Sequence, residues 1–163
     1  MKTIVYRGGV VTFRIPAHWL EEYSDMDGGT FYEDRPESGT LRLKIMTART
    51  PTQVQSTSSL EVLDPLVRML KEQQGAKGST RKRSDGNAVF KYEEHGFDDG
   101  VKLTVFYWVI ANPLPPCHAR LATFSYTIVA NQLGQSHIQR DLEMLEAEIE
   151  AASFARVMGT TSG

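Results

Sequence analysis

Alternating apolar and polar residues predict two strands at the start of the chain, at 3–7 and 10–15. The apolar residues of the second strand all fall on one of its faces, as in a half-buried strand. A glycine pair, Gly8-Gly9, separates the two strands, and such a pair is a signal for a tight turn. The chain therefore begins with a predicted β-hairpin.

Strand patterns continue over most of the chain. They predict further strands at 30–33, 40–48, 79–84, 88–94, 101–111 and 120–130. Asp85-Gly86-Asn87 lies between two of these strands and has the composition of a hairpin turn. The strand at 101–111 has apolar residues on both faces in its second half, which is typical of a central strand covered on both sides. A short helical turn is predicted over 17–23.

Two longer segments have apolar residues at helical spacing, at 60–74 and 136–154. In the second segment the apolar stripe recurs at alternating intervals of four and three residues. Pro65 interrupts the first pattern. It marks either a kink or the first turn of a helix that Asp64 caps.

Strands that follow one another through tight turns favour antiparallel pairing. We therefore predict an α+β fold, with a central antiparallel sheet of about six or seven strands and the two long helices packed on it. A chain of 163 residues can bury a core without disulfides or metals. We expect a single domain over 1–158 and a flexible tail over 159–163.

Composition narrows the possible partners. The chain is 40% hydrophobic and 23% charged, with a formal net charge of -2, which gives no reason to expect nucleic acid or an anionic membrane as a partner. The N-terminal residues include no apolar segment of signal-peptide length, and no run of about 18 apolar residues follows. Cys117 is the single cysteine, so no intramolecular disulfide can form. We expect a cytoplasmic protein.

Residues that could carry chemistry are scattered. The four histidines (His18, His95, His118 and His137) have no spacing that would place two metal ligands on one face of a helix or strand. Cys117 follows two prolines in a predicted loop. It does not lie at a helix N-terminus, where the pKa of its thiol would be lowered. We therefore expect no metal site, no cofactor and no catalytic activity.

Four residues remain as candidates for a binding site. Thr123, Ser125 and Thr127 place three hydroxyls on one face of an otherwise apolar strand, which indicates either an exposed sheet face or a polar groove. Trp19 lies at an element boundary, where an aromatic side chain can line a pocket. Trp108, in the middle of a strand, is expected in the core.

The second predicted strand and the residues that follow it carry a family resemblance. Phe13 and Ile15 lead into Pro16, which ends the strand pairing, and Trp19 follows three residues later. With the order of the elements, this resembles the PsbP/Mog-like superfamily, which includes bacterial DcrB-like proteins. The resemblance implies an antiparallel sheet sandwiched by helices. Members that look like this include a photosynthetic accessory protein, a Ran-binding protein and chaperones of secretion effectors, so the resemblance implies no common active site.

Two hypotheses for function follow. The first is a non-catalytic binding or adaptor protein that recognises another protein, most concretely a chaperone or accessory of a secretion effector. The alternative is a small-molecule-binding protein or an unrecognised enzyme, with a groove near Trp19 and the face of Thr123, Ser125 and Thr127. The sequence leaves open the identity of the partner, the oligomeric state and the role of Cys117.

Overall fold

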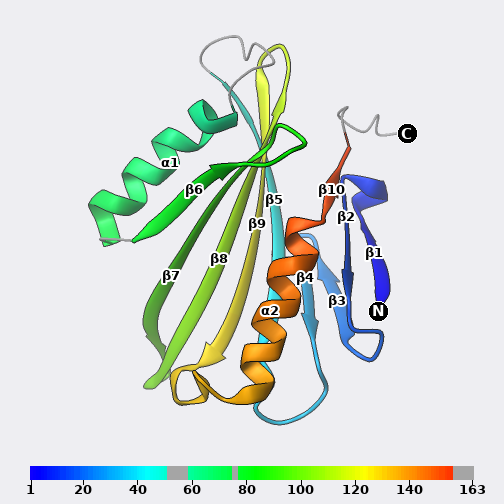
Figure 1. Ribbon diagram of the computed structural model, residues 1–163, viewed down its shortest axis with the longest axis vertical. Helices are drawn as coiled ribbons and strands as arrows, with labels where there is room; N and C mark the ends of the chain where they lie inside the picture. Colours follow the sequence, from blue (N-terminus) through cyan, green and yellow to red (C-terminus); the bar gives the residue numbers. More distant parts are fainter. Residues whose placement is uncertain (51–58, 75–76, 156–163) are drawn as a thin grey trace.

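Figure 1 shows a computed structural model of the chain, which describes residues 1–50, 59–74 and 77–155. Within these residues two antiparallel sheets and two α-helices form the molecule. The architecture is α+β, as the sequence predicts.

The main sheet has seven strands in the order β3-β4-β5-β9-β8-β7-β6, and every neighbouring pair is antiparallel. Its strands are β3 (Leu20–Ser24), β4 (Gly28–Tyr32), β5 (Thr40–Arg49), β6 (Gly78–Lys82), β7 (Ala88–Asp98), β8 (Val101–Leu114) and β9 (His118–Val129). The long strands β8 and β9 pair in the middle of the sheet, where apolar residues on both faces of β8 are buried. This confirms the prediction of an interior strand that is covered on both faces in its second half.

A second sheet has three strands in the order β1-β2-β10. Its strands are β1 (Lys2–Tyr6), β2 (Val11–Ile15) and the two-residue β10 (Ser153–Phe154). A short 3₁₀ turn over Arg7–Gly9 joins β1 to β2, so the predicted N-terminal hairpin is confirmed. Pairing of β10 with β2 brings the last described residues beside the beginning of the chain.

Helix α1 (Ser59–Gln74) lies on one face of the main sheet, beside β6, β7 and β8 (Figure 1). Leu63 and Leu70 pack against Phe90 of β7 and Val109 of β8 in a small apolar cluster. Pro65 lies inside this helix, so α1 extends to both sides of the proline and does not start there.

Helix α2 (Ser136–Glu150) and the small sheet cover the opposite face. Phe13 of β2 makes edge-to-face contacts with Phe31 and Phe124 of the main sheet, with ring centroids 5.4 and 5.2 Å apart. Arg14 points the other way and donates two hydrogen bonds to Glu148 of α2, at 2.8 and 2.7 Å. The alternation in β2 therefore holds the small sheet against the main sheet on one face and links it to the neighbouring helix α2 on the other.

The helical turn predicted over 17–23 is wrong. The N–H of Trp19 donates to the carbonyl of Pro16 at 3.1 Å, which closes a single turn, and the chain then enters strand β3. Five residues of β3 pair with β4. All of them are exposed, so this edge strand has no buried alternation by which its sequence could be recognised.

Several predicted boundaries also need correction. The strand predicted at 101–111 continues to Leu114. The strand predicted at 79–84 ends at Lys82, whereas the strand predicted at 88–94 continues to Asp98. The helix predicted over 136–154 ends at Glu150, and Ser153 and Phe154 at the end of the predicted range form β10. The extension of β7 arises from long-range pairing with β8, which a local pattern does not contain.

The predicted tail at 159–163 lies outside the described residues, and the single domain over 1–158 stays a prediction. Neither of the two described helices combines the length and the apolar character needed to cross a membrane.

Candidate functional site

Strand β7 is longer than its neighbour β6. Pairing between them starts at Lys82 with Ala88 and ends at Gly78 with Tyr92. Beyond this point β7 continues from Glu93 to Asp98 and pairs only with β8 among the described strands. Half of β7 is therefore a free sheet edge, visible below β6 in Figure 1.

The backbone groups along this free edge point outward at every second residue. In an antiparallel ladder, hydrogen-bonded and non-hydrogen-bonded pairs alternate. The N–H of Arg83 donates to the carbonyl of Asn87 at 2.6 Å beside the β6–β7 turn. Counting from this pair, Glu93, His95 and Phe97 direct their N–H and C=O groups away from β8. All three residues are exposed.

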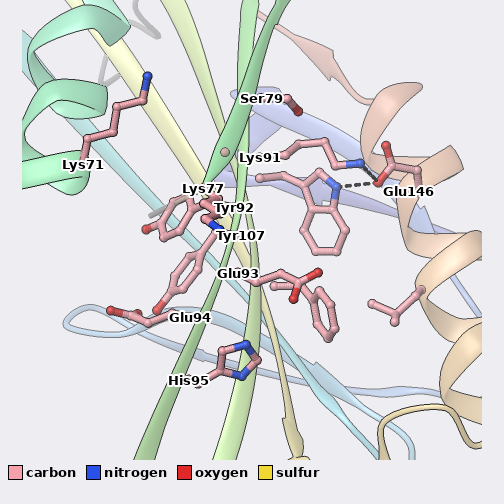
Figure 2. A pocket seen from close by; sticks show the side chains of 14 residues that line it. Lys71, Lys77, Ser79, Lys91, Tyr92, Glu93, Glu94, His95, Tyr107 and Glu146 are labelled. Carbon is pink, nitrogen blue, oxygen red and sulfur yellow. Dashed lines mark hydrogen bonds and ion pairs between the residues drawn. The ribbon is translucent and has the colours of Figure 1, made fainter. Parts of the chain in front are cut away.

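An open hollow of ≈ 1460 Å³ surrounds this edge. Its lining comes from α1, the start of β6, β7, β8 and α2: Lys71, Lys77, Gly78, Ser79, Lys91, Tyr92, Glu93, Glu94, His95, Phe106, Tyr107, Trp108, Leu142 and Glu146. The register of β7 with β8 divides these residues between the two faces of the sheet. Figure 2 shows labelled lining residues on both sides of the strand, so the hollow reaches both faces of the sheet.

On the α2 side the hollow combines apolar side chains with a neutralised charge pair. Phe106, Trp108 and Leu142 supply the apolar surface. Glu146 accepts hydrogen bonds from Lys91 Nζ at 2.5 Å and from Trp108 Nε1 at 2.8 Å (Figure 2). Burial alone would raise the pKa of Glu146, but these two hydrogen bonds and the charge of Lys91 lower it below its ordinary value. Glu146 therefore stays ionised and paired.

On the α1 side the hollow has an aromatic wall. The rings of Tyr92 and Tyr107 are a cross-strand pair, stacked with centroids 4.5 Å apart and planes 8° from parallel. Burial and the nearby carboxylate of Glu94 raise the pKa of Tyr92 to about 12 and also raise the pKa of Tyr107. Both phenols are therefore neutral at physiological pH. Lys71 of α1 and Lys77, the residue before β6, also line the hollow.

Trp19 does not lie in a groove. Its side chain is 2% exposed and stacks on Tyr126, with ring centroids 6.5 Å apart. Tyr126 belongs to the core cluster on the α2 face of the sheet. Trp19 therefore packs in the core at the end of β2.

Thr123, Ser125 and Thr127 lie on the other face of β9, half-buried in each case. They pair with residues of β8, Ser125 directly with Tyr107. The sheet separates them from Trp19, so the structure does not bring the four predicted residues into one site.

The other residues considered for chemistry are dispersed. Cys117 Sγ lies 3.4 Å from His118 Nδ1, whereas His95 contacts Thr104 and His137 contacts the carbonyl of Glu37. Within the described residues, no three histidine, cysteine, aspartate or glutamate side chains come together as metal ligands.

The hollow at the β7 edge is the site that the sequence did not reveal. The site exists because β7 is longer than its partner β6. It therefore depends on where β6 begins opposite β7, at Gly78 and Tyr92. The sequence segment from His95 to Asp98 lacks a clear alternation, so the predicted strand ended at Glu94.

Comparison with known proteins supports the fold class, an α+β protein built on an antiparallel sheet. No protein-family model matches the chain, and neither does any curated protein sequence. The crystal structure of LpqN, involved in cell envelope biogenesis of Mycobacterium tuberculosis, is similar with a TM-score of 0.62. It is 13% identical, and the alignment covers 89% of this chain and 83% of LpqN.

A second similar structure comes from Bacteroides thetaiotaomicron, with a TM-score of 0.60 and 15% identity. The alignment covers 94% of this chain and 48% of the Bacteroides chain, so this chain corresponds to about half of it. At these identities, both similarities show the fold alone.

Proposed function

We propose that this protein is a non-catalytic protein-recognition module that binds an extended segment of a partner along the free edge of β7. One observation carries the proposal: β7 continues beyond the start of β6, and an open hollow adjoins the continuing segment at Glu93, Glu94 and His95. We place the protein in the cytoplasm, as the sequence suggests.

Strand addition suits this edge for a physical reason. An added strand gains main-chain hydrogen bonds to the outward groups of Glu93, His95 and Phe97. Its side chains alternate between the two faces of the sheet. The hollow is open on both faces at this edge, so it offers space for both sets of side chains.

Within this proposal, the most concrete role is that of a chaperone or accessory for a secretion effector, in the PsbP/Mog-like superfamily. The order of the elements and the Pro16–Trp19 turn support this assignment. Such a chaperone would hold one extended segment of one client protein.

Substitution of His95 tests the proposal without disturbing the sheet. His95→Pro removes an N–H that points away from β8, at an edge position where proline is tolerated. His95→Thr is the matched control, because it also removes the imidazole but keeps the N–H and favours a strand.

The measurement is affinity capture from the native host with the wild type and both variants, followed by quantitative mass spectrometry. We expect one near-stoichiometric partner with the wild type and with His95→Thr, and its loss with His95→Pro. A partner retained by His95→Pro, or no stoichiometric partner, would contradict strand addition.

A second candidate function is small-molecule binding on the face of Thr123, Ser125 and Thr127. One observation favours it: the three hydroxyl-bearing residues are half-buried, and Ser125 lies in one cross-strand row between Tyr107 and exposed Arg42. A thermal-shift screen of metabolites on the wild type and on Ser125→Val tests this function. We expect a compound that stabilises the wild type and not the variant. No stabilising compound, or equal stabilisation of both, would argue against it.

A further inference from the structure

At one end of the free edge, β6 already occupies the position beside β7. We call this end, at Gly78, the closed end. A strand added beside Glu93 to Asp98 lies on the same line as β6, which begins at Gly78 opposite Tyr92. The added chain therefore cannot continue straight past Gly78. It must turn away there or end there, and an end fits without any further bend.

The charges at this closed end favour a carboxylate. Lys71 and Lys77 line the hollow, both are exposed, and neither forms an ion pair with a described residue. Glu94 lies on the α1 side, and its carboxylate offsets one of these two positive charges, which leaves an excess of one positive charge at this end. The two lysines would therefore attract a carboxyl terminus and repel an amino terminus.

The remaining charged groups of the hollow do not offset this preference. On the α2 side Lys91 is already paired with Glu146. Glu93 and His95 lie on that same face, so the sheet separates their side chains from the α1 side.

We propose that the bound segment is the C-terminal tail of a partner protein, with its α-carboxylate at Lys71 and Lys77. This inference rests on the proposed function of strand addition. The tail runs in the direction of β6, antiparallel to β7, so that its carboxyl end reaches Gly78. Its alternate side chains face Phe106, Trp108 and Leu142, which favours large apolar residues there.

The experiment uses two pools of random octapeptides that differ only at the C-terminus, one with free carboxylates and one amidated. The full-length protein is incubated with each pool, and bound peptides are quantified by mass spectrometry. We expect about tenfold greater recovery from the free-acid pool, the ratio that about 1.4 kcal/mol of charge-assisted binding gives.

The double substitution Lys71→Gln and Lys77→Gln should reduce this ratio to about one, since no fixed positive charge then remains at the closed end. Lys82→Gln is the matched control. It removes an exposed lysine at the other end of β6, and we expect it to leave the ratio unchanged.

The outcomes separate the two proposals. Equal recovery from both pools, lost with His95→Pro, would overturn the C-terminal inference and leave strand addition intact. Recovery that His95→Pro does not reduce, or no recovery from either pool, would overturn both. A free-acid preference that persists in the double lysine variant would overturn the assignment of the carboxylate to Lys71 and Lys77.

Discussion

The two ends of β7 lie in different surroundings. Its first residues pair with β6 and β8, and Ala88, Val89 and Phe90 are fully buried under α1 on one face and in the main core on the other. Its last residues pair with β8 alone and are exposed. The same strand thus contributes to stability at one end and offers unpaired backbone at the other. Substitutions in the closed and open regions should therefore differ in what they change.

The largest difference is expected for phenylalanine. Phe13 packs between Phe31 and Phe124, so Phe13→Ala should lower the free energy of unfolding by about 3–5 kcal/mol. Phe97, at the open end of β7, is 76% exposed. Phe97→Ala should change stability by no more than about 0.5 kcal/mol. Urea denaturation of both variants measures this, and similar losses would show that the open end is packed in solution.

A smaller difference is expected for tyrosine hydroxyls. Tyr126 is buried and donates a hydrogen bond to Asp141 at 2.8 Å. Tyr126→Phe leaves that carboxylate without its donor and should cost about 1–3 kcal/mol. Tyr107→Phe removes the half-buried hydroxyl that contacts Glu94, and we expect a loss of about 0.5 kcal/mol, because water can replace it. Urea denaturation measures both losses, and a larger loss for Tyr107→Phe would contradict the comparison.

Two carboxylates of α2 should respond to pH in opposite directions. Burial raises the pKa of Asp141 in the folded state, and Tyr126, Arg35 and His137 offset this only in part. Ionisation of Asp141 therefore destabilises the folded state. The stability contributed by the protonated carboxyl is fully present below the unfolded pKa and is lost as the pH rises through the folded pKa. Asp141→Asn should flatten this fall, which begins as the pH rises above the ordinary aspartate pKa of about 3.9.

The pKa of Glu146, which lines the hollow, is shifted in the opposite direction to that of Asp141. Its folded pKa is lowered, because the hydrogen bonds from Lys91 and Trp108 outweigh burial. The stability it contributes is present above its ordinary pKa and is lost as the pH falls through the folded value. Glu146→Gln should therefore lose less stability on acidification below about pH 4.5. Urea midpoints across this range for both variants test the pair, and shifts of the same sign would contradict it.

Much of the fold could be predicted from the sequence, because its signals are local. The hairpin at Gly8-Gly9, the turn at Asp85-Gly86-Asn87 and the stripe of α2 each depend on neighbouring residues. The candidate site depends on two strand ends that meet in space, Gly78 and Tyr92, and no local pattern encodes that meeting. The hydroxyls of Thr123, Ser125 and Thr127 were correctly assigned to one strand face. Trp19 was placed beside them only because the sequence does not show which face it covers.

Backbone amide exchange along β7, followed by NMR, tests strand addition most directly. In the free protein we expect Glu94 and Gly96 to be protected by β8, and Glu93, His95 and Phe97 to exchange quickly. With a selected free-acid peptide bound, the second set should slow by at least about tenfold, while the first set stays as it was. If these three amides still exchange quickly in the complex, the partner does not add a strand to β7, and the central claim is wrong.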